Sequence, residues 1–202
     1  MFALVESGKI TKYLSGNKGV VIGDVQYPKT IFGLWSKDER EAIGIYEIEI
    51  DNTNLKDEKW YINTDITYSF DSGKVTGSYG TATAKAHTDI LFTAQDETDG
   101  LGTEGDVKFV GLKTILIRKI KREAASELQN TDWYVIRKAD AGTAIPSGIT
   151  THRAAVRTKV AEMETAITNA ADTPALETLY TYTRQEDGSV TRPLGELPKL
   201  ES

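Results

Sequence analysis

The chain has 202 residues, of which 27% are charged and 39% hydrophobic, and it contains no cysteine and only two histidines. This composition is typical of one large or two small globular domains that need no metal or disulfide to fold. The missing cysteines exclude disulfides, thiolate zinc sites, iron–sulfur clusters and cysteine nucleophiles. The net charge is −6, and the clustered basic residues fall on an apparent helix beside Glu123 and Glu127, so we expect no nucleic-acid partner.

The sequence predicts neither membrane insertion nor secretion. No segment approaches the ~20 apolar residues of a membrane span. The apolar run Met1–Val5 is too short for the core of a signal peptide and has no basic region before it. We therefore expect synthesis in the cytoplasm and no membrane partner.

Residues 1–94 are predicted to form a small antiparallel β domain. Ser7-Gly8 and Asp71-Ser72-Gly73 are typical of tight hairpin turns, and the segment 46–50 alternates apolar and charged residues as a half-exposed strand does. A short helix interrupts the strands. Ser36 and Glu39 have the spacing of a capping box, and Gly44 follows as the expected end of that helix.

The segment 95–106 is acidic and rich in glycine, and we interpret it as a mobile loop or linker at a domain boundary. Residues 100–105 match G-x-G-x-x-G letter for letter. A dinucleotide site needs a strand before this motif and a helix after it, whereas here acidic residues precede it and a strand-like segment, 107–110, follows. The spacing also fails the EF-hand pattern, since Leu101 stands at the position of the invariant glycine. We expect no cofactor and no metal.

Residues 107–182 are predicted to form a helical hairpin, followed by an extended tail over residues 183–202. A first helix is indicated by one apolar face, and a longer second helix opens at Pro146. The apolar stripe of the long helix consists of Ile149, His152, Val156, Val160, Met163, Ile167 and Ala170. Packing against the first helix explains this stripe, and a coiled-coil seam between identical chains is the alternative. Asp172 is expected to cap a third, short helix.

No set of residues in the sequence resembles a catalytic site. His87 and Asp89 share one side of a possible strand, but no Gly-x-Ser-x-Gly elbow supplies a nucleophile. Glu47 and Glu49 face solvent on one strand, where nothing would raise a carboxyl pKa for acid catalysis. The sequence therefore predicts a protein that is not an enzyme.

A resemblance to a known module begins at Leu128. The run 128–133, Leu-Gln-Asn-Thr-Asp-Trp, is followed by Arg137, Pro146 and the run 153–157, Arg-Ala-Ala-Val-Arg. This pattern resembles a C-terminal module of tailed bacteriophages, found in tail fibre assembly chaperones and in tail or fibre proteins, many from marine phages. Segment 3–9, and Tyr27-Pro28 followed by segment 39–45, also resemble the N-terminal part of such proteins. His152 departs from the module, which usually has an aromatic residue there.

The resemblance implies a non-enzymatic structural or interaction protein of a tailed-phage virion, in the tail, baseplate or fibre. Its partners would be other tail or fibre proteins and further copies of itself, with the β half as a docking domain. The alternative is a fibre assembly chaperone that leaves before the particle is complete. Trp133 is expected to be buried, and Arg153 and Arg157 either pair with Glu123 or Glu127 or face solvent. The candidate interaction residues are Asp132, Trp133, Arg153, Val156, Arg157, Val160, Met163 and Ile167.

Overall fold

The computed structural model describes residues 1–200, and its fold is α+β, as predicted. The chain divides into two compact units, unit 1 from Met1 to Thr83 and unit 2 from Ala84 onward. The division therefore falls before the segment 95–106, where the sequence had suggested a boundary. That segment belongs to a hairpin that leaves from unit 2 and returns to it.

Unit 1 is built on a five-stranded sheet with the strand order β2-β1-β5-β8-β7. Its strands are β1 (Phe2–Glu6), β2 (Lys9–Leu14), β5 (Ile45–Asp51), β7 (Ile66–Asp71) and β8 (Lys74–Tyr79). The smaller elements of this part of the chain are β3 (Val20–Ile22), β4 (Val25–Tyr27), α1 (Ile31–Leu34), α2 (Lys37–Ala42), β6 (Tyr61–Ile62) and β9 (Thr83–Ala84).

The prediction of a purely antiparallel sheet is wrong, because β5 and β8 pair in parallel while the other neighbours are antiparallel. The reason is the long connection after Asp51. Through this connection the chain leaves one place free next to β5 and forms β7 at the edge of the sheet. The β7–β8 hairpin then places β8 between β7 and β5. Local patterns predict each strand but not this order.

Both faces of β1 are buried, which explains its continuous apolar sequence. Leu4 packs on one face with Ile31 and Ile45, and Ala3 and Val5 pack on the other with Val75. The sheet curls, so that the edge strands β2 and β7 come into contact and the rings of Tyr13 and Tyr68 lie 5.0 Å apart.

The local signals of unit 1 are confirmed. Ser7 and Ser72 have positive φ angles, as the first residue of each tight hairpin turn requires. Ser36 and Glu39 form the capping box at the start of α2. Gly44 has φ +81°, and a Cβ there would lie 2.6 Å from the Val5 carbonyl oxygen, so glycine both ends the helix and lets the chain approach β1.

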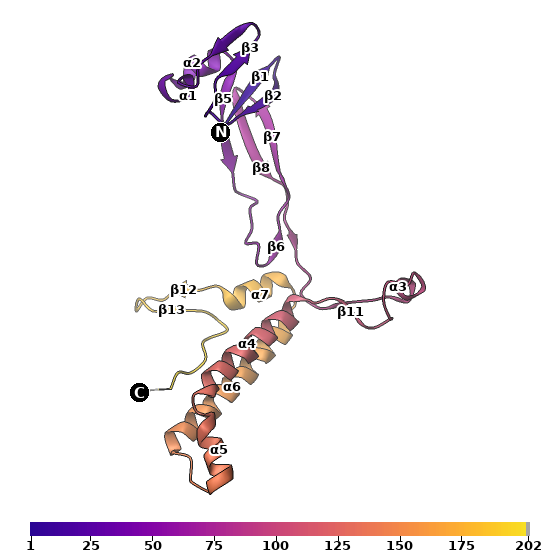
Figure 1. Ribbon diagram of the computed structural model, residues 1–202, viewed down its shortest axis with the longest axis vertical. Coiled ribbons are helices and arrows are strands. Elements are labelled where there is room, and N and C mark those ends of the chain that lie inside the picture. Colours follow the sequence, from indigo (N-terminus) through magenta and orange to yellow (C-terminus); the bar gives the residue numbers. More distant parts are fainter. Residues whose placement is uncertain (201–202) are drawn as a thin grey trace. The chain divides into compact units, whose positions relative to one another are not determined.

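Unit 2 contains the long helices α4 (Leu112–Gln129) and α6 (Ser147–Asn169), which lie side by side in Figure 1. They are antiparallel, since the Lys113 ammonium donates to the Thr168 carbonyl near one end while Arg153 donates to the Leu128 carbonyl near the other. The shorter helices are α5 (Asp132–Ala141) and α7 (Thr173–Tyr180), the latter capped by Asp172 as predicted. Pro146 is the residue before α6 and not its first residue.

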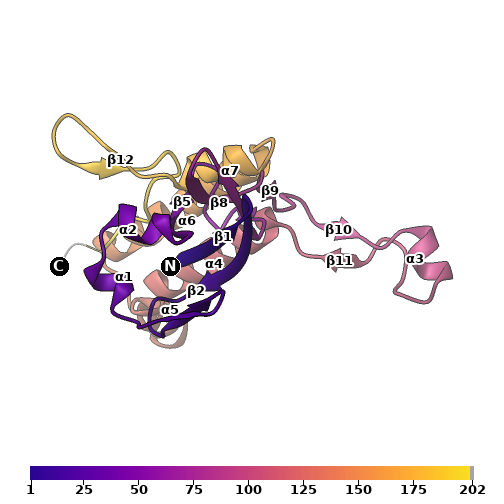
Figure 2. The same cartoon turned by 90° about the horizontal axis from the view of Figure 1, so that it is seen from above.

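A hairpin arm, defined as residues 86–111, projects from the helices of unit 2 (Figure 2). It consists of β10 (Ile90–Leu91), α3 (Ala94–Thr98) and β11 (Val107–Phe109). The interpretation of 95–106 as an unstructured loop is therefore wrong in its first part. Thr93 and Asp96 form a capping box that starts α3, and their spacing in the sequence is the local signal for this helix.

The C-terminal segment begins with a small hairpin of β12 (Thr183–Arg184) and β13 (Val190–Thr191). The prediction of an extended tail over residues 183–202 is therefore wrong in its first part. Beyond the hairpin the chain forms no further helix or strand up to residue 200, and it turns where the Gly195 amide donates to the Arg192 carbonyl at 2.9 Å. This segment is anchored to the helices. Leu194 is buried, and Lys199 forms an ion pair with Glu127 of α4. The last two residues of the predicted tail lie outside the described residues. Among residues 1–200, no helix is long and apolar enough to cross a membrane.

Candidate interaction surface

The helix pair of unit 2 buries the apolar stripe predicted for the long helix. Val156, Met163 and Ile167 of α6 are almost completely buried, as are Leu116 and Ile120 of α4. Val160 is half-buried at the edge of this core. The structure thus places Met163 and Ile167 in the interior, where they stabilise the pair and are not available to a partner.

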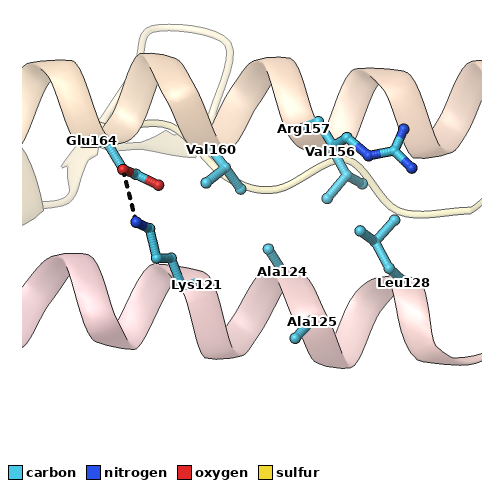
Figure 3. A pocket seen from close by; sticks show the side chains of 8 residues that line it. All are labelled: Lys121, Ala124, Ala125, Leu128, Val156, Arg157, Val160 and Glu164. Carbon is cyan, nitrogen blue, oxygen red and sulfur yellow. Dashed lines mark ion pairs between the residues drawn. The ribbon is translucent and has the colours of Figure 1, made fainter.

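An open groove of about 320 Å³ runs along one side of the helix pair (Figure 3). Val156 and Val160 point into it from α6, and Ala124 and Leu128 face them from α4. Charged groups flank this apolar floor. The groove is lined by Lys121, Ala124, Ala125, Leu128, Val156, Arg157, Val160 and Glu164.

Charges close the two ends of the groove. Lys121 Nζ lies 3.2 Å from Glu164 Oε2 and joins the two helices at one end. Arg157 lies at the other end, is exposed, and forms no ion pair among residues 1–200. The groove therefore offers a partner an apolar surface together with one free guanidinium. Three of the candidate residues, Val156, Arg157 and Val160, line the groove, of which Val156 is itself buried while Val160 and Arg157 are accessible.

A hydrogen-bonded cluster fixes the turn between α4 and α5 against α6. The guanidinium Nη1 of Arg153 lies 2.8 Å from Asp132 Oδ1 and donates to the Thr131 hydroxyl at 2.6 Å and to the Leu128 carbonyl at 3.0 Å. The Thr131 hydroxyl itself donates to the Leu128 carbonyl at 2.8 Å. Neither alternative predicted for Arg153 holds, because it pairs with Asp132 and not with Glu123 or Glu127, and it is buried and does not face solvent.

Trp133 is not buried, contrary to the prediction. Its side chain is 49% exposed at the start of α5, a helix without any buried residue. The Trp133 ring lies 4.0 Å from the ring of Tyr134, and the guanidinium of Arg137 lies 4.5 Å from its centroid. The Leu-Gln-Asn-Thr-Asp-Trp run continues into a full helix, α5, which has Trp133 as its second residue. Trp133 and Ile136, which is 67% exposed, together give α5 an apolar outer surface.

Glu127 is held by two residues that sequence reasoning did not connect to it. Lys199 Nζ donates to its carboxylate at 2.6 Å, and Nε2 of the buried His152 lies 3.5 Å away. The hydrogen bond from Lys199 is the main cause of the lowered pKa of Glu127. Lys199 is 72 residues away in the chain, so no local pattern could reveal this contact.

The remaining chemical candidates have structural roles. The carboxylate of Asp89 accepts a hydrogen bond from the Gly111 amide at 2.7 Å, so it anchors the arm and does not orient His87. Glu47 and Glu49 are exposed and pair with Arg40 and Lys74. Among residues 1–200, no group of three or more histidine, aspartate and glutamate side chains could hold a metal ion.

No protein-family model, curated protein or solved structure matches this chain. The resemblance to the phage module therefore depends on the residues themselves. Four of them, Leu128, Thr131, Asp132 and Arg153, meet in the hydrogen-bonded cluster described above.

Proposed function

We propose that the chain is a non-enzymatic structural or interaction protein of a tailed-phage virion, in the tail, baseplate or tail fibre. The observation that carries this proposal is the groove between α4 and α6. An apolar floor bordered by Lys121, Glu164 and Arg157 is suited to a protein partner, because apolar contacts supply affinity and the charged border selects the partner.

The spatial clustering of the resemblance residues supports the same reading. A Leu-x-x-Thr-Asp run and a distant arginine need not be related in sequence, yet here they form one turn-to-helix clamp. The clamp holds α5 in place, and α5 in turn exposes Trp133 and Ile136. Exposed aromatic side chains on a fixed helix are common anchors of protein interfaces.

The assembly that we propose contains several copies of the chain together with other tail or fibre proteins. Unit 1 acts as the docking domain through its sheet, and the helix pair of unit 2 provides a second contact surface. The division of the chain into two compact units would let each half contact a different neighbour in a particle.

A fibre assembly chaperone, absent from the finished particle, is the second candidate. The observation that favours it is the exposure of apolar side chains on α5 and in the groove, since a chaperone must keep such a surface accessible for its client. The two candidates differ in whether the chain remains with the particle.

The test of this function uses a phage that lacks the gene and cells that supply a tagged chain. Particles are purified on a gradient, and the chain is detected in them by immunoblot. We expect the wild-type chain in the particles. The amount of Ala125→Arg in the particles should be about tenfold lower, because this substitution puts a charged side chain into the groove. The matched control is Ala155→Arg, an exposed alanine of α6 outside the groove, which should be incorporated normally.

Absence of the wild-type chain from infectious particles would contradict the virion reading and support the chaperone. Equal incorporation of Ala125→Arg and Ala155→Arg would contradict the role given to the groove.

A further inference from the structure

The arm exposes apolar side chains that have no core to enter. Ile90, Leu91, Val107 and Phe109 of its two strands are all exposed, and so is Leu101 near its tip. Leu101 and Phe109 are each 60% exposed. A two-stranded ribbon by itself is marginally stable in water, and an exposed apolar ribbon indicates a surface that a partner covers.

The arm is nevertheless held in one conformation at its base. The amides of Leu112 and Lys113 donate to the carbonyls of Ala86 and His87, each at 3.0 Å. Gly111 crosses Thr88 so closely that a Cβ at Gly111 would lie 2.2 Å from the Thr88 carbonyl carbon. The two strands of the arm therefore leave the helices as a fixed pair.

The tip of the arm is fixed as well. Lys108 Nζ lies 2.6 Å from Asp96 Oδ1, and the Phe92 amide donates to the Asp106 carbonyl at 2.9 Å. Because base and tip are both ordered, little conformational entropy remains to be lost when a partner binds.

The arm is also strongly acidic. Between Asp89 and Asp106 the sequence has six acidic residues and no basic one. Asp96 pairs with Lys108, but Glu104 and Asp106 are exposed and have no cationic partner in the described part of the chain, residues 1–200. A surface that fits the arm must be apolar and basic.

Such a surface lies on α4 of the same chain. Residues 112–122 include five basic residues and no acidic one. Ile115, Arg118, Lys119 and Arg122 follow the spacing i, i+3, i+4, i+7 and form one side of the helix, here named the α4 stripe. Ile115 is 47% exposed, and a hollow of about 550 Å³ opens between Ile115, Arg118, Lys121 and Arg122.

The arginines of the α4 stripe are free to bind. Lys119 pairs weakly with Glu123 along the helix, while Arg118 and Arg122 are exposed and form no ion pair with any other described residue of 1–200. Two unpaired arginines beside an exposed isoleucine match two unpaired carboxylates beside an exposed leucine on the arm.

We propose that the arm of one copy of this chain binds the α4 stripe of a second copy. Leu101 and Phe109 cover Ile115, while Glu104 and Asp106 pair with Arg118 and Arg122. The two surfaces differ, so the contact is head-to-tail and produces a closed ring or a filament, according to the rotation between copies. The inference goes beyond the proposed function and does not depend on it, because it concerns the purified chain alone.

The α4 stripe is better suited to bind the arm of a second copy than to bind a nucleic acid. The acidic arm ends directly before α4, and its carboxylates would repel a phosphate backbone bound beside them. The arm of a second copy, by contrast, neutralises the stripe and covers its own apolar residues in the same contact.

The experiment measures self-association of the full chain by sedimentation equilibrium at low salt and at high salt. We expect wild type to associate and high salt to weaken the association. Arg118→Glu/Arg122→Glu and Glu104→Lys/Asp106→Lys should each raise the dissociation constant at least about tenfold. The variant with all four substitutions should associate again, since the charges are exchanged and not removed. This restoration also shows that the charge reversals leave the chain folded.

The matched controls are Arg184→Glu in β12 and Glu186→Lys in the β12–β13 turn, exposed charges outside the groove, the arm and the α4 stripe, which should leave the dissociation constant unchanged. The proposal is overturned by a wild-type chain that is monomeric at every concentration. It is also overturned if only the α4 reversal weakens association, or if the fourfold exchange does not restore it. None of these outcomes bears on whether the chain is found in phage particles, which is tested separately.

Discussion

Arg153 and Arg157 lie one helical turn apart on α6, and the structure gives them different tasks. Arg153 is 10% exposed and joins Leu128, Thr131 and Asp132, whereas Arg157 is exposed at the end of the groove. Sequence spacing placed both on one side of the helix. It could not tell which arginine reaches the α4–α5 turn, because that depends on where α5 begins.

Arg153→Ala should lower the free energy of unfolding by about 1–3 kcal/mol, since it removes charged hydrogen bonds from a buried site while the half-exposed Asp132 regains water. Arg157→Ala should change it by less than about 0.5 kcal/mol, as exposed substitutions usually do. Urea unfolding of both variants measures the difference. Equal effects would mean that the cluster does not stabilise the turn.

Trp133→Ala should lower the free energy of unfolding by less than about 1 kcal/mol, because the side chain is half exposed and its ring lies against Tyr134 of the same helix. Met163→Ala removes a buried side chain and should lower the free energy of unfolding by about 2–5 kcal/mol. Thermal unfolding followed by circular dichroism compares the two. A large loss for Trp133→Ala would show that this side chain is buried after all.

At the scale of elements, signals that lie within a few residues of one another were predictable. The Ser7 and Ser72 hairpin turns, the Ser36–Glu39 capping box and the stripe of α6 all follow from local spacing. The parallel pairing of β5 with β8 does not follow from local spacing, because it depends on a long connection that leads to β7 at the sheet edge before β8 forms. The candidate groove was half predicted: Val156, Arg157 and Val160 were named as interaction candidates, but Ala124, Ala125 and Leu128 of α4 were not.

The arm provides a prediction of pH dependence. The ion pair and hydrogen bond with Lys108, together with the Thr93 capping box, lower the pKa of Asp96 from 3.8 to about 2. A lowered pKa means that ionised Asp96 stabilises the arm above its ordinary pKa, and that this stabilisation is lost as the pH falls through the range from about 4 to about 2. Amide hydrogen exchange in α3 should therefore accelerate over that range, beyond the intrinsic pH effect.

Asp96→Asn is the control for this pH dependence, because the variant cannot titrate. Its α3 amides should exchange faster than wild type at neutral pH and show no additional change between about pH 4 and pH 2. Identical exchange in the two chains over the whole range would contradict the role given to Asp96.

At the scale of the whole molecule, the chain presents three distinct surfaces in unit 2: the groove, the outer side of α5, and the arm with its α4 stripe. Each surface combines exposed apolar side chains with fixed charges or aromatic rings. Exposed apolar surface is unfavourable in water for a protein that acts alone. Such surfaces are expected in a chain that is covered by neighbours in an assembly.

The most direct test of this account is quantitative peptide mass spectrometry of gradient-purified phage particles, with copy number measured against the major capsid protein. The account predicts the chain in the particle at a fixed copy number that is a multiple of three or six, as the symmetry of tails and fibres requires. A chain that is abundant in the infected lysate but missing from the particles would contradict it and leave the assembly chaperone as the function.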